Sequence, residues 1–229
     1  MSPHPLDNPI WESLLSRHRS MAQRSGDVAR YPPAIAPFLG VADPEAEIGP
    51  ALESLLAPDE AVYLLGPRVG VPEGWRLQHL GQLAQMVCPA RLAEVHGPEI
   101  IALSEIHRDD VLALTALVYP HYFRPRTMEM GRYFGVYEGA RLAAMIGERM
   151  GTDQYTEISA VCTHPDFNGR GYARHLLAWL SNDLIERQRT PFLHVSHENL
   201  RAKQLYQRSG YHDRCDISFW SLRRKGSDA

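Results

Sequence analysis

A glycine-containing turn between a predicted strand and a long predicted helix is the feature that most constrains how this chain can fold. Residues 155–163 are expected to form the strand, and residues 171–187 carry an apolar stripe at helical spacing. The turn between them reads Asn168-Gly-Arg-Gly171. The first turn of a helix leaves backbone N–H groups unpaired, and its dipole favours an anion. Since glycine lets the backbone approach a ligand closely, residues 168–174 are built like a phosphate cradle, with Arg170 and Arg174 as possible charge-assisted contacts.

Other interpretations of this turn remain open on the residues alone. Asn-Gly is a common dipeptide in tight turns, so the turn by itself is weak evidence for a phosphate site. A P-loop requires a Gly-Lys-Ser/Thr ending, which the chain lacks. A dinucleotide fingerprint would require glycine where Arg174 stands. These two classes of nucleotide site are therefore not supported.

The chain from about residue 99 onward alternates between strand and helix patterns. Strands are expected at 100–104 and 191–195, and 133–137 with 141–150 form a hairpin around Glu138-Gly139. Helices are expected at 109–117 and 200–209, the second ending before Gly210, and residues 211–222 form the last strand or strands. The resulting order, β-α-β-β-β-α-β-α-β, indicates a mixed α/β or α+β layer structure.

Composition excludes several classes of partner. The net charge is −3, and no basic cluster suggests a nucleic acid or a membrane surface. The three cysteines are far apart and form no CxxC pair, so we expect free thiols in a reducing cytoplasm and no metal site. No apolar run approaches the ~20 residues that a spanning helix needs.

Two motifs give the chain a resemblance to a known family. The segment Asn168-Gly-Arg-Gly171-Tyr-Ala173 resembles motif A of the GNAT acyltransferases, Arg/Gln-x-x-Gly-x-Gly/Ala, with asparagine at the first position. Downstream, Asn199-Leu-Arg-Ala202-Lys-Gln-Leu205-Tyr206, followed by Gly210-Tyr211, is similar to the family pattern N-x-x-A-x-x-L-Y-x-x-x-G-F/Y. The resemblance covers residues 99–224, and the FR47-like branch, which includes glycine N-acyltransferase-like proteins, is the most similar.

The resemblance implies a fold, a reaction and a set of site residues. The fold would be the GNAT acyltransferase fold, a mixed, mostly antiparallel sheet flanked by helices, here with an N-terminal α/β extension. The reaction would be acetyl transfer from acetyl-CoA to a primary amine by direct attack, without a metal. Tyr206 would protonate the departing thiolate. The cofactor would be held near Asn199, on the strand residues Val161, Cys162 and Thr163, and on the turn residues Asn168, Gly169, Arg170, Gly171, Tyr172, Ala173 and Arg174.

The general base is less sharply defined by the sequence. Glu157 lies four residues before Val161 on the same predicted strand, where the histone acetyltransferase branch of the family carries a catalytic glutamate. A strand carboxylate facing the acyl site is able to remove the amine proton. Glu148, on the neighbouring strand, is the next candidate. His107, His121, His194 and His197 are weaker candidates, and Cys162 as a ping-pong nucleophile is the least favoured interpretation.

The first 98 residues carry no nameable motif, although apolar residues at helical spacing predict helices at 10–22 and 45–56, and a short apolar run predicts a strand at 61–65. We divide the chain into residues 1–98 and an acetyltransferase domain at 99–229. The first part is a degenerate acyltransferase-like half, a cap over the substrate or a homodimer interface. The acceptor is a small amine, an amino acid or a peptide amine, and Arg124 and Arg126 in the loop 119–132 either hold a carboxylate or are solvated charges.

Two further alternatives to an acetyltransferase stay open. One is a catalytically silent acyl-CoA-binding sensor or assembly module, which Asn168 in place of Arg or Gln favours. The other is an enzyme for longer acyl chains. Retention of both Tyr206 and Glu157 favours the acetyltransferase.

Overall fold

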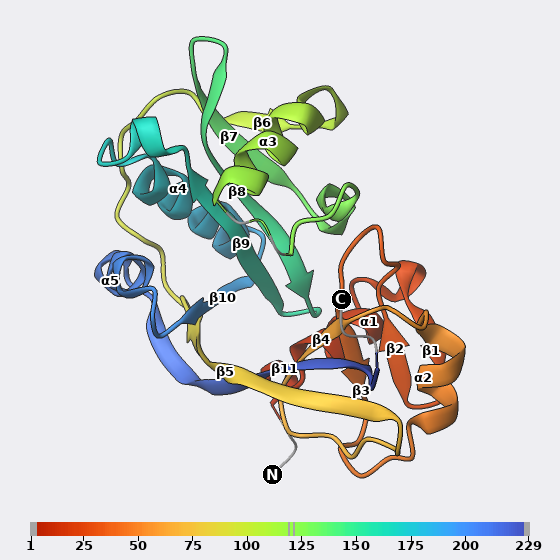
Figure 1. Ribbon diagram of the computed structural model, residues 1–229. Helices are drawn as coiled ribbons and strands as arrows, with labels where there is room; N and C mark the ends of the chain where they lie inside the picture. Colours follow the sequence, from red (N-terminus) through yellow and green to blue (C-terminus); the bar gives the residue numbers. More distant parts are fainter. Residues whose placement is uncertain (1–3, 119, 121, 227–229) are drawn as a thin grey trace.

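A computed structural model describes residues 4–118, 120 and 122–226 of the chain. Its main feature is an eight-stranded sheet with the strand order β4-β11-β5-β10-β9-β8-β7-β6, and a three-stranded sheet, β1-β2-β3, lies beside it. Neighbouring strands of the large sheet are antiparallel except for β9 and β10, which are parallel. Figure 1 shows this sheet with helices packed against it, which confirms the mixed, mostly antiparallel fold class.

The second part of the chain has the predicted order of elements. The hairpin of β7 and β8 turns at Glu138-Gly139-Ala140-Arg141, as the sequence indicates, and α5 ends at Gly210 in a left-handed conformation. The elements are β6 (Ile101–Leu103), η3 (Glu105–His107), α3 (Arg108–Val118), η4 (Thr127–Met130), β7 (Tyr133–Glu138), β8 (Arg141–Gly151), β9 (Tyr155–Thr163), η5 (Pro165–Phe167), α4 (Tyr172–Glu186), β10 (Thr190–Ser196), α5 (Leu200–Ser209) and β11 (His212–Arg224).

The first part of the chain is only partly as expected. The helix expected over residues 10–22 ends at Leu15, and the long strand β5 was not anticipated. The elements are η1 (Pro5–Asp7), α1 (Pro9–Leu15), η2 (Arg19–Met21), β1 (Gln23–Ser25), β2 (Val28–Arg30), β3 (Leu39–Val41), α2 (Gly49–Leu55), β4 (Val62–Leu65) and β5 (Trp75–Val87).

The large sheet crosses the division that we drew at residue 98. Strand β5 lies between β10 and β11 and pairs with both, and β4 pairs with the far edge of β11. The segment before residue 98 therefore supplies two strands to the same sheet that carries the second part of the chain.

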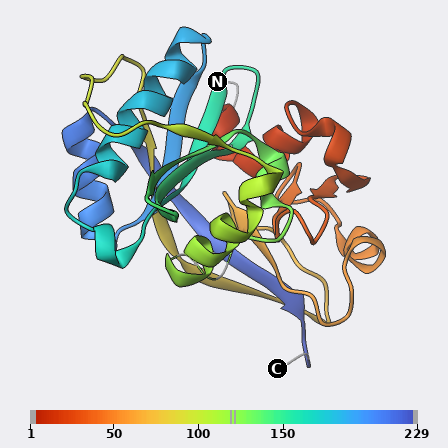
Figure 2. The same cartoon turned by 90° about the horizontal axis from the view of Figure 1, so that it is seen from above.

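The two faces of the sheet are covered by different elements (Figure 2). Helices α4 and α5 pack on one face, in a cluster that contains Leu176, Leu180 and Tyr206. Helix α3 packs on the other face of β8 and β9, in a cluster with Val111, Leu114 and Cys162. Side chains of β9 enter both clusters, Ile158 and Val161 the first and Ala160 and Cys162 the second, so this strand has a covered side toward α4 and another toward α3.

Candidate functional site

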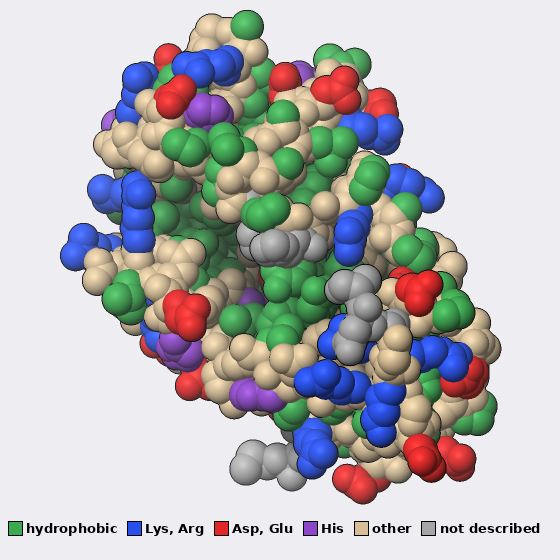
Figure 3. All heavy atoms as spheres, in the orientation of Figure 1, with side chains coloured by type: hydrophobic (Ala, Val, Ile, Leu, Met, Phe, Trp, Pro, Cys, Tyr) green, Lys and Arg blue, Asp and Glu red, His purple; other side chains and the backbone are tan. Residues whose placement is uncertain are grey.

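The sheet opens between its two parallel strands. β9 and β10 are in register only at their beginnings, from Thr190 opposite Tyr155 to Phe192 opposite Glu157. Beyond that point β9 continues to pair with β8 and β10 with β5, while the two parallel strands no longer pair with each other. A cavity of about 550 Å³ fills the opening, lined among others by Ser159 to Cys162 of β9 and His194 to Ser196 of β10. Figure 3 shows the molecule hollowed near its centre, with hydrophobic side chains gathered in the hollow.

A bulge in β9 lies at the wall of this cavity. Met145 is opposite Cys162 and Gly147 is opposite Ser159, so Ile146 faces both Ala160 and Val161. Ala160 has a φ of 50°, a left-handed conformation that is uncommon for a residue with a side chain. The N–H of His164 donates to the carbonyl oxygen of Ala143 on β8. Because N–H directions alternate along an antiparallel strand, the N–H groups of Cys162 and Val161 point to opposite edges, and that of Val161 points away from β8.

The turn before α4 has the backbone conformation of an anion site. Gly169 and Gly171 have φ of +81° and +82°, and a Cβ added at either position would meet no atom within 4 Å. Gly171 is the N-cap of α4 and places the helix N-terminus at the turn. Among the described residues, the N–H groups of residues 169–174 donate to no backbone carbonyl. This combination leaves an open row of donors at the positive end of a helix dipole.

The side chains around this turn have different roles. Asn168 is exposed, and its Oδ1 accepts a 3.5 Å hydrogen bond from Arg201 of α5. Arg170 lies over the ring of Phe167 and 3.8 Å from the Glu138 carboxylate, and both Arg170 and Arg174 are exposed beside the turn. The Tyr172 hydroxyl donates to the Glu138 carboxylate instead, so this side chain does not contribute its hydroxyl to the turn. Ala173 is half-buried in the first turn of α4.

The second motif reaches the same cavity from α5. The Asn199 side chain caps the helix by accepting from the N–H of Ala202 at 3.1 Å, which fixes where α5 begins. Asn199, Ala202 and Tyr206 all line the cavity together with Val161 and Cys162. The fold therefore brings the second motif to the opening beside β9, and the bond between Asn168 and Arg201 places the glycine turn next to the first turn of α5.

Glu157, the expected base, lies beneath the cavity rather than in its wall. Its side chain is fully buried, and its carboxylate accepts two hydrogen bonds from Arg149, at 2.8 and 2.6 Å. A third bond comes from the Nδ1 atom of His194 at 2.7 Å. Burial favours a higher pKa for Glu157, but Arg149 and His194 outweigh it and lower the pKa to about 2. A carboxylate with so low a pKa is a weak proton acceptor at neutral pH.

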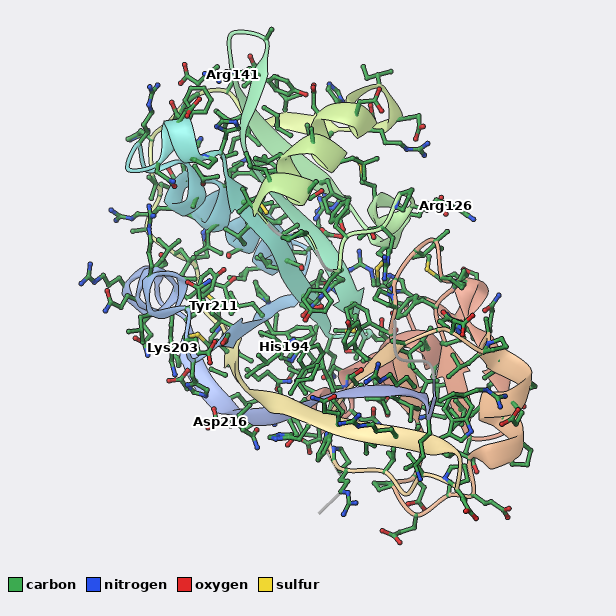
Figure 4. The ribbon with its side chains drawn as sticks, viewed as in Figure 1. Arg126, Arg141, His194, Lys203, Tyr211 and Asp216 are labelled. Carbon is green, nitrogen blue, oxygen red and sulfur yellow. The ribbon has the colours of Figure 1, made fainter. Side chains whose placement is uncertain are left out.

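His194 is held in one tautomer by its neighbours. The Gln85 Oε1 atom accepts from Arg214, so the amide nitrogen of Gln85 is directed to the Nε2 atom of His194, 2.9 Å away. Nε2 therefore accepts, and Nδ1 carries the proton that is donated to Glu157. His194 lines the cavity, and Figure 4 shows it toward the middle of the molecule. His197, in contrast, pairs with Asp216 at the surface.

The remaining candidates lie away from the cavity or are unreactive. Glu148 is buried between Arg17 and Arg132 and does not line the cavity. Burial raises the pKa of the Cys162 thiol to about 12, so it stays protonated and is a poor nucleophile. His107 bonds the N–H of Ser104 at the surface.

The arginines of the loop 119–132 do not line the cavity. Arg124 and Arg126 are both exposed, and Arg126 pairs with Glu129. Figure 4 shows Arg126 pointing away from the molecule. Tyr119 and His121 lie outside the described residues. The structure thus favours solvated charges for this pair of arginines.

Several lining residues were missed by the sequence analysis. Arg149, Ser159 and Ser196 belong to no motif, and only the expected pairing of the strands 141–150 and 155–163 could have pointed to a contact between Arg149 and Glu157. The apolar part of the lining comes mostly from segments without motifs. Its members from outside the strands β9 and β10 and outside both motifs are Phe38, Leu65, Leu80, Leu83, Val118, Tyr122 and Phe219.

Comparison with known proteins gives this geometry a context. The FR47-like protein family matches residues 133–221. A GNAT-family protein from Novosphingobium aromaticivorans is 33% identical, with a TM-score of 0.89 over 97% of this chain and 100% of its own. A GCN5-related N-acetyltransferase from Kribbella flavida has the same fold at 16% identity, with a TM-score of 0.64 over 94% of this chain and 93% of its own.

Two further findings are negative. No curated protein matches the sequence. Within the described residues, no helix is long and apolar enough to cross a membrane, and no cluster of three His, Cys, Asp or Glu side chains is arranged to hold a metal ion.

Proposed function

The chain belongs to the GNAT family of acetyltransferases, and we propose that it transfers an acetyl group from acetyl-CoA to a primary amine by direct attack. The observation that carries the proposal is the cavity between β9 and β10, which joins the bulged strand, Asn199 and Tyr206 at one place. The glycine turn lies at the N-terminus of α4, the helix that follows β9 in the chain.

The residues of the turn and of the cavity fit acetyl-CoA. The open backbone at Gly169 and Gly171 suits a pyrophosphate, which a Cβ at either position would crowd. Arg170 and Arg174 add positive charge, and Asn199 lies in the wall along which a pantetheine arm would extend. When bound, acetyl-CoA supplies an activated acyl carbon to the amine.

Residues of β9 and α5 perform the chemistry in this proposal. The N–H of Val161, which points away from β8, binds the carbonyl oxygen, and such donors are typically worth a few kcal/mol in the transition state. Tyr206 gives its phenolic proton to the sulfur as the C–S bond breaks and the C–N bond forms. The nitrogen releases one proton to water, and Tyr206 regains one proton from water, so protons balance over the reaction.

Glu157 has a positioning role in this proposal. Its carboxylate holds Arg149 and fixes the tautomer of His194, and its pKa of about 2 makes it unsuited to collect the amine proton. Since no carboxylate side chain is among the described residues that line the cavity, the amine binds in its neutral form. The specificity constant kcat/KM therefore rises with pH until the acceptor amine is deprotonated.

We also propose that the protein works in a reducing compartment such as the cytoplasm. Cys88, Cys162 and Cys215 are free thiols, and Cys88 and Cys162 are buried.

Calorimetric titration with acetyl-CoA tests the proposal. Wild-type protein should bind with a Kd of about 1–100 μM, and Gly169→Val with Gly171→Val should weaken binding at least ~30-fold, because the side chains crowd the turn and strain its backbone. Gly139→Val is the matched control, since Gly139 also has positive φ, at +61°, and open space but lies in the β7–β8 turn. Absence of binding by the wild type would exclude the proposal.

Turnover separates an enzyme from a silent binding protein. The sensor alternative is favoured by Asn168, whose side chain bonds Arg201 and replaces the usual Arg or Gln. Release of CoA in the presence of an amine series supports the enzyme, and tight binding without turnover for every amine supports the sensor.

A further inference from the structure

One end of the cavity has an apolar wall. Phe38 and Leu65 are buried in the cluster around α1 and β2, and Leu83 and Phe219 pack against that cluster. Leu80 of β5 and Val118 of α3 complete the wall and are unusually exposed for large apolar residues, at 43% and 38%. Exposed apolar side chains that meet in one concave place mark a surface that a ligand covers.

A second strand bulge turns Leu80 to this wall. On β11, Phe219 is opposite Gly81 and Trp220 is opposite His79, so Leu80 is the extra residue between them. Gly81 has a φ of +137°, a backbone conformation in which side chains are strained. A bulge re-aims a side chain that a regular strand would direct to the other face.

The charges around the cavity disfavour a ligand that carries a second positive charge. Among the described residues that line it, none is aspartate or glutamate, and the one arginine or lysine among them is Arg149. The carboxylate of Glu157 is already bonded to Arg149 and to His194. A second positive charge on a ligand would be desolvated here without a partner.

The cavity passes through the sheet from one face to the other. Val161, Ala202 and Tyr206 belong to the α4 and α5 face, where the glycine turn also lies. Ala160 and Cys162 belong to the cluster with α3 on the opposite face. If acetyl-CoA enters from the turn, the apolar wall is the surface that remains for the amine.

We propose that the apolar wall binds the acceptor, and that the acceptor is a primary amine on a single apolar body, such as a phenyl ring, without a second positive charge. This inference rests on the proposed function and names the substrate class of the same site. The amine nitrogen lies toward Val161 and Tyr206, and the apolar body lies against Leu80, Leu83 and Phe219.

A pair of amines tests the proposal directly. The specificity constant kcat/KM is measured for phenethylamine and for putrescine with saturating acetyl-CoA. The pH is chosen for each amine so that the same fraction of its molecules carries one neutral amino group. We expect the aromatic amine to be preferred at least ~10-fold, because the aliphatic diamine leaves an unpaired charge at an apolar wall. Equal values, or preference for the diamine, would overturn the inference.

A variant of the wall and a matched control sharpen the test. Leu80→Asp introduces a carboxylate at a position that is already exposed to solvent, and should lower the preference for phenethylamine at least ~10-fold. Ile106→Asp is the control, because Ile106 is 88% exposed and does not line the cavity. It should leave the preference unchanged. An equal effect of both variants would overturn the role of Leu80.

Binding measurements separate the two levels of the proposal. If acetyl-CoA does not bind, the proposed function and this inference fail together. If acetyl-CoA binds and turns over but the diamine is preferred, the inference fails alone. If octanoyl-CoA binds at least ~10-fold more tightly than acetyl-CoA and Leu80→Asp removes that gain, the wall holds an acyl chain, and the inference is wrong.

Discussion

The two parts of the chain contribute different kinds of wall to one cavity. Residues 133–221 contain both motifs and supply the bulged strand, Asn199 and Tyr206 to the wall, with the glycine turn at the N-terminus of α4. Residues before 98 contain no motif, yet they supply β5 and the apolar residues Phe38, Leu65, Leu80 and Leu83. A segment without a recognisable pattern is therefore an integral part of the candidate site.

The difference has a physical reason. A backbone cradle for phosphate needs residues that adopt positive φ without strain, and this requirement puts glycine at fixed positions. An apolar wall needs only side chains of suitable size, and many combinations of residues satisfy it. The phosphate cradle therefore leaves a motif in the sequence, whereas the apolar wall leaves none.

The largest effect is expected at the floor of the cavity, where the two parts meet through Glu157, His194 and Gln85. Glu157→Gln leaves Arg149, which is 11% exposed, without its charge partner, and should lower the free energy of unfolding by about 3–5 kcal/mol. Urea denaturation measures the change. Glu129→Gln removes an exposed ion pair with Arg126 and should change stability by less than about 1 kcal/mol.

The loss of stability in Glu157→Gln should depend on pH. The pKa of Glu157 is lowered from 4.5 to about 2 in the folded protein, so its stabilisation is present above pH 4.5 and is lost as the pH falls toward 2. The difference between wild type and Glu157→Gln should therefore shrink below pH 4.5. A difference that is constant with pH would show that the carboxylate charge contributes nothing.

The next effect isolates the motif-bearing wall. Tyr206→Phe removes only the phenolic hydroxyl from a side chain that is 7% exposed, and should lower kcat about 100-fold or more while the Kd for acetyl-CoA stays unchanged. A CoA-release assay measures kcat, and calorimetry measures the Kd for acetyl-CoA. Tyr137→Phe is a control, because Tyr137 bonds Asp110 and does not line the cavity. Unchanged turnover in Tyr206→Phe would assign the proton donor elsewhere.

The smallest effect tests how the first part of the chain is held to the second. His18 is buried, and its Nε2 atom bonds the Met130 carbonyl oxygen at 2.8 Å, while Tyr31 lies 2.8 Å from Nδ1. Burial is the main cause that lowers the pKa of His18 from 6.5 to about 4. Between these values the unfolded chain binds more protons, so stability should fall by up to about 1.4 kcal/mol from pH 6.5 to 5.5.

His18→Gln and His212→Gln separate this effect from other titrations. His18→Gln should remove that part of the pH dependence, as measured by urea denaturation at both pH values. His212 is exposed, and His212→Gln should leave the dependence as in the wild type. An identical pH dependence in all three proteins would contradict the assignment to His18.

The sequence by itself determined the elements that have regular patterns. The alternation from residue 99 onward predicted the order from β6 to β11, because amphipathic helices and strands bury one face each. Strand β5 was not predicted, since its bulge at Leu80 shifts the alternation of side chains halfway along the strand. The helix expected over 10–22 is shorter because the chain leaves the helical conformation at Ser16.

Only the tertiary structure decided which polar side chains are buried with partners and which face the cavity. Glu157 and His194 are 37 residues apart in the chain, and their bond at 2.7 Å arises where two parallel strands meet. That contact and the ion pair with Arg149 bury the Glu157 carboxylate and lower its pKa to about 2. Local sequence specifies φ preferences and apolar periodicity, which depend on near neighbours. Burial, charge partners and the apolar wall depend on residues distant in the chain, and packing alone brings them together.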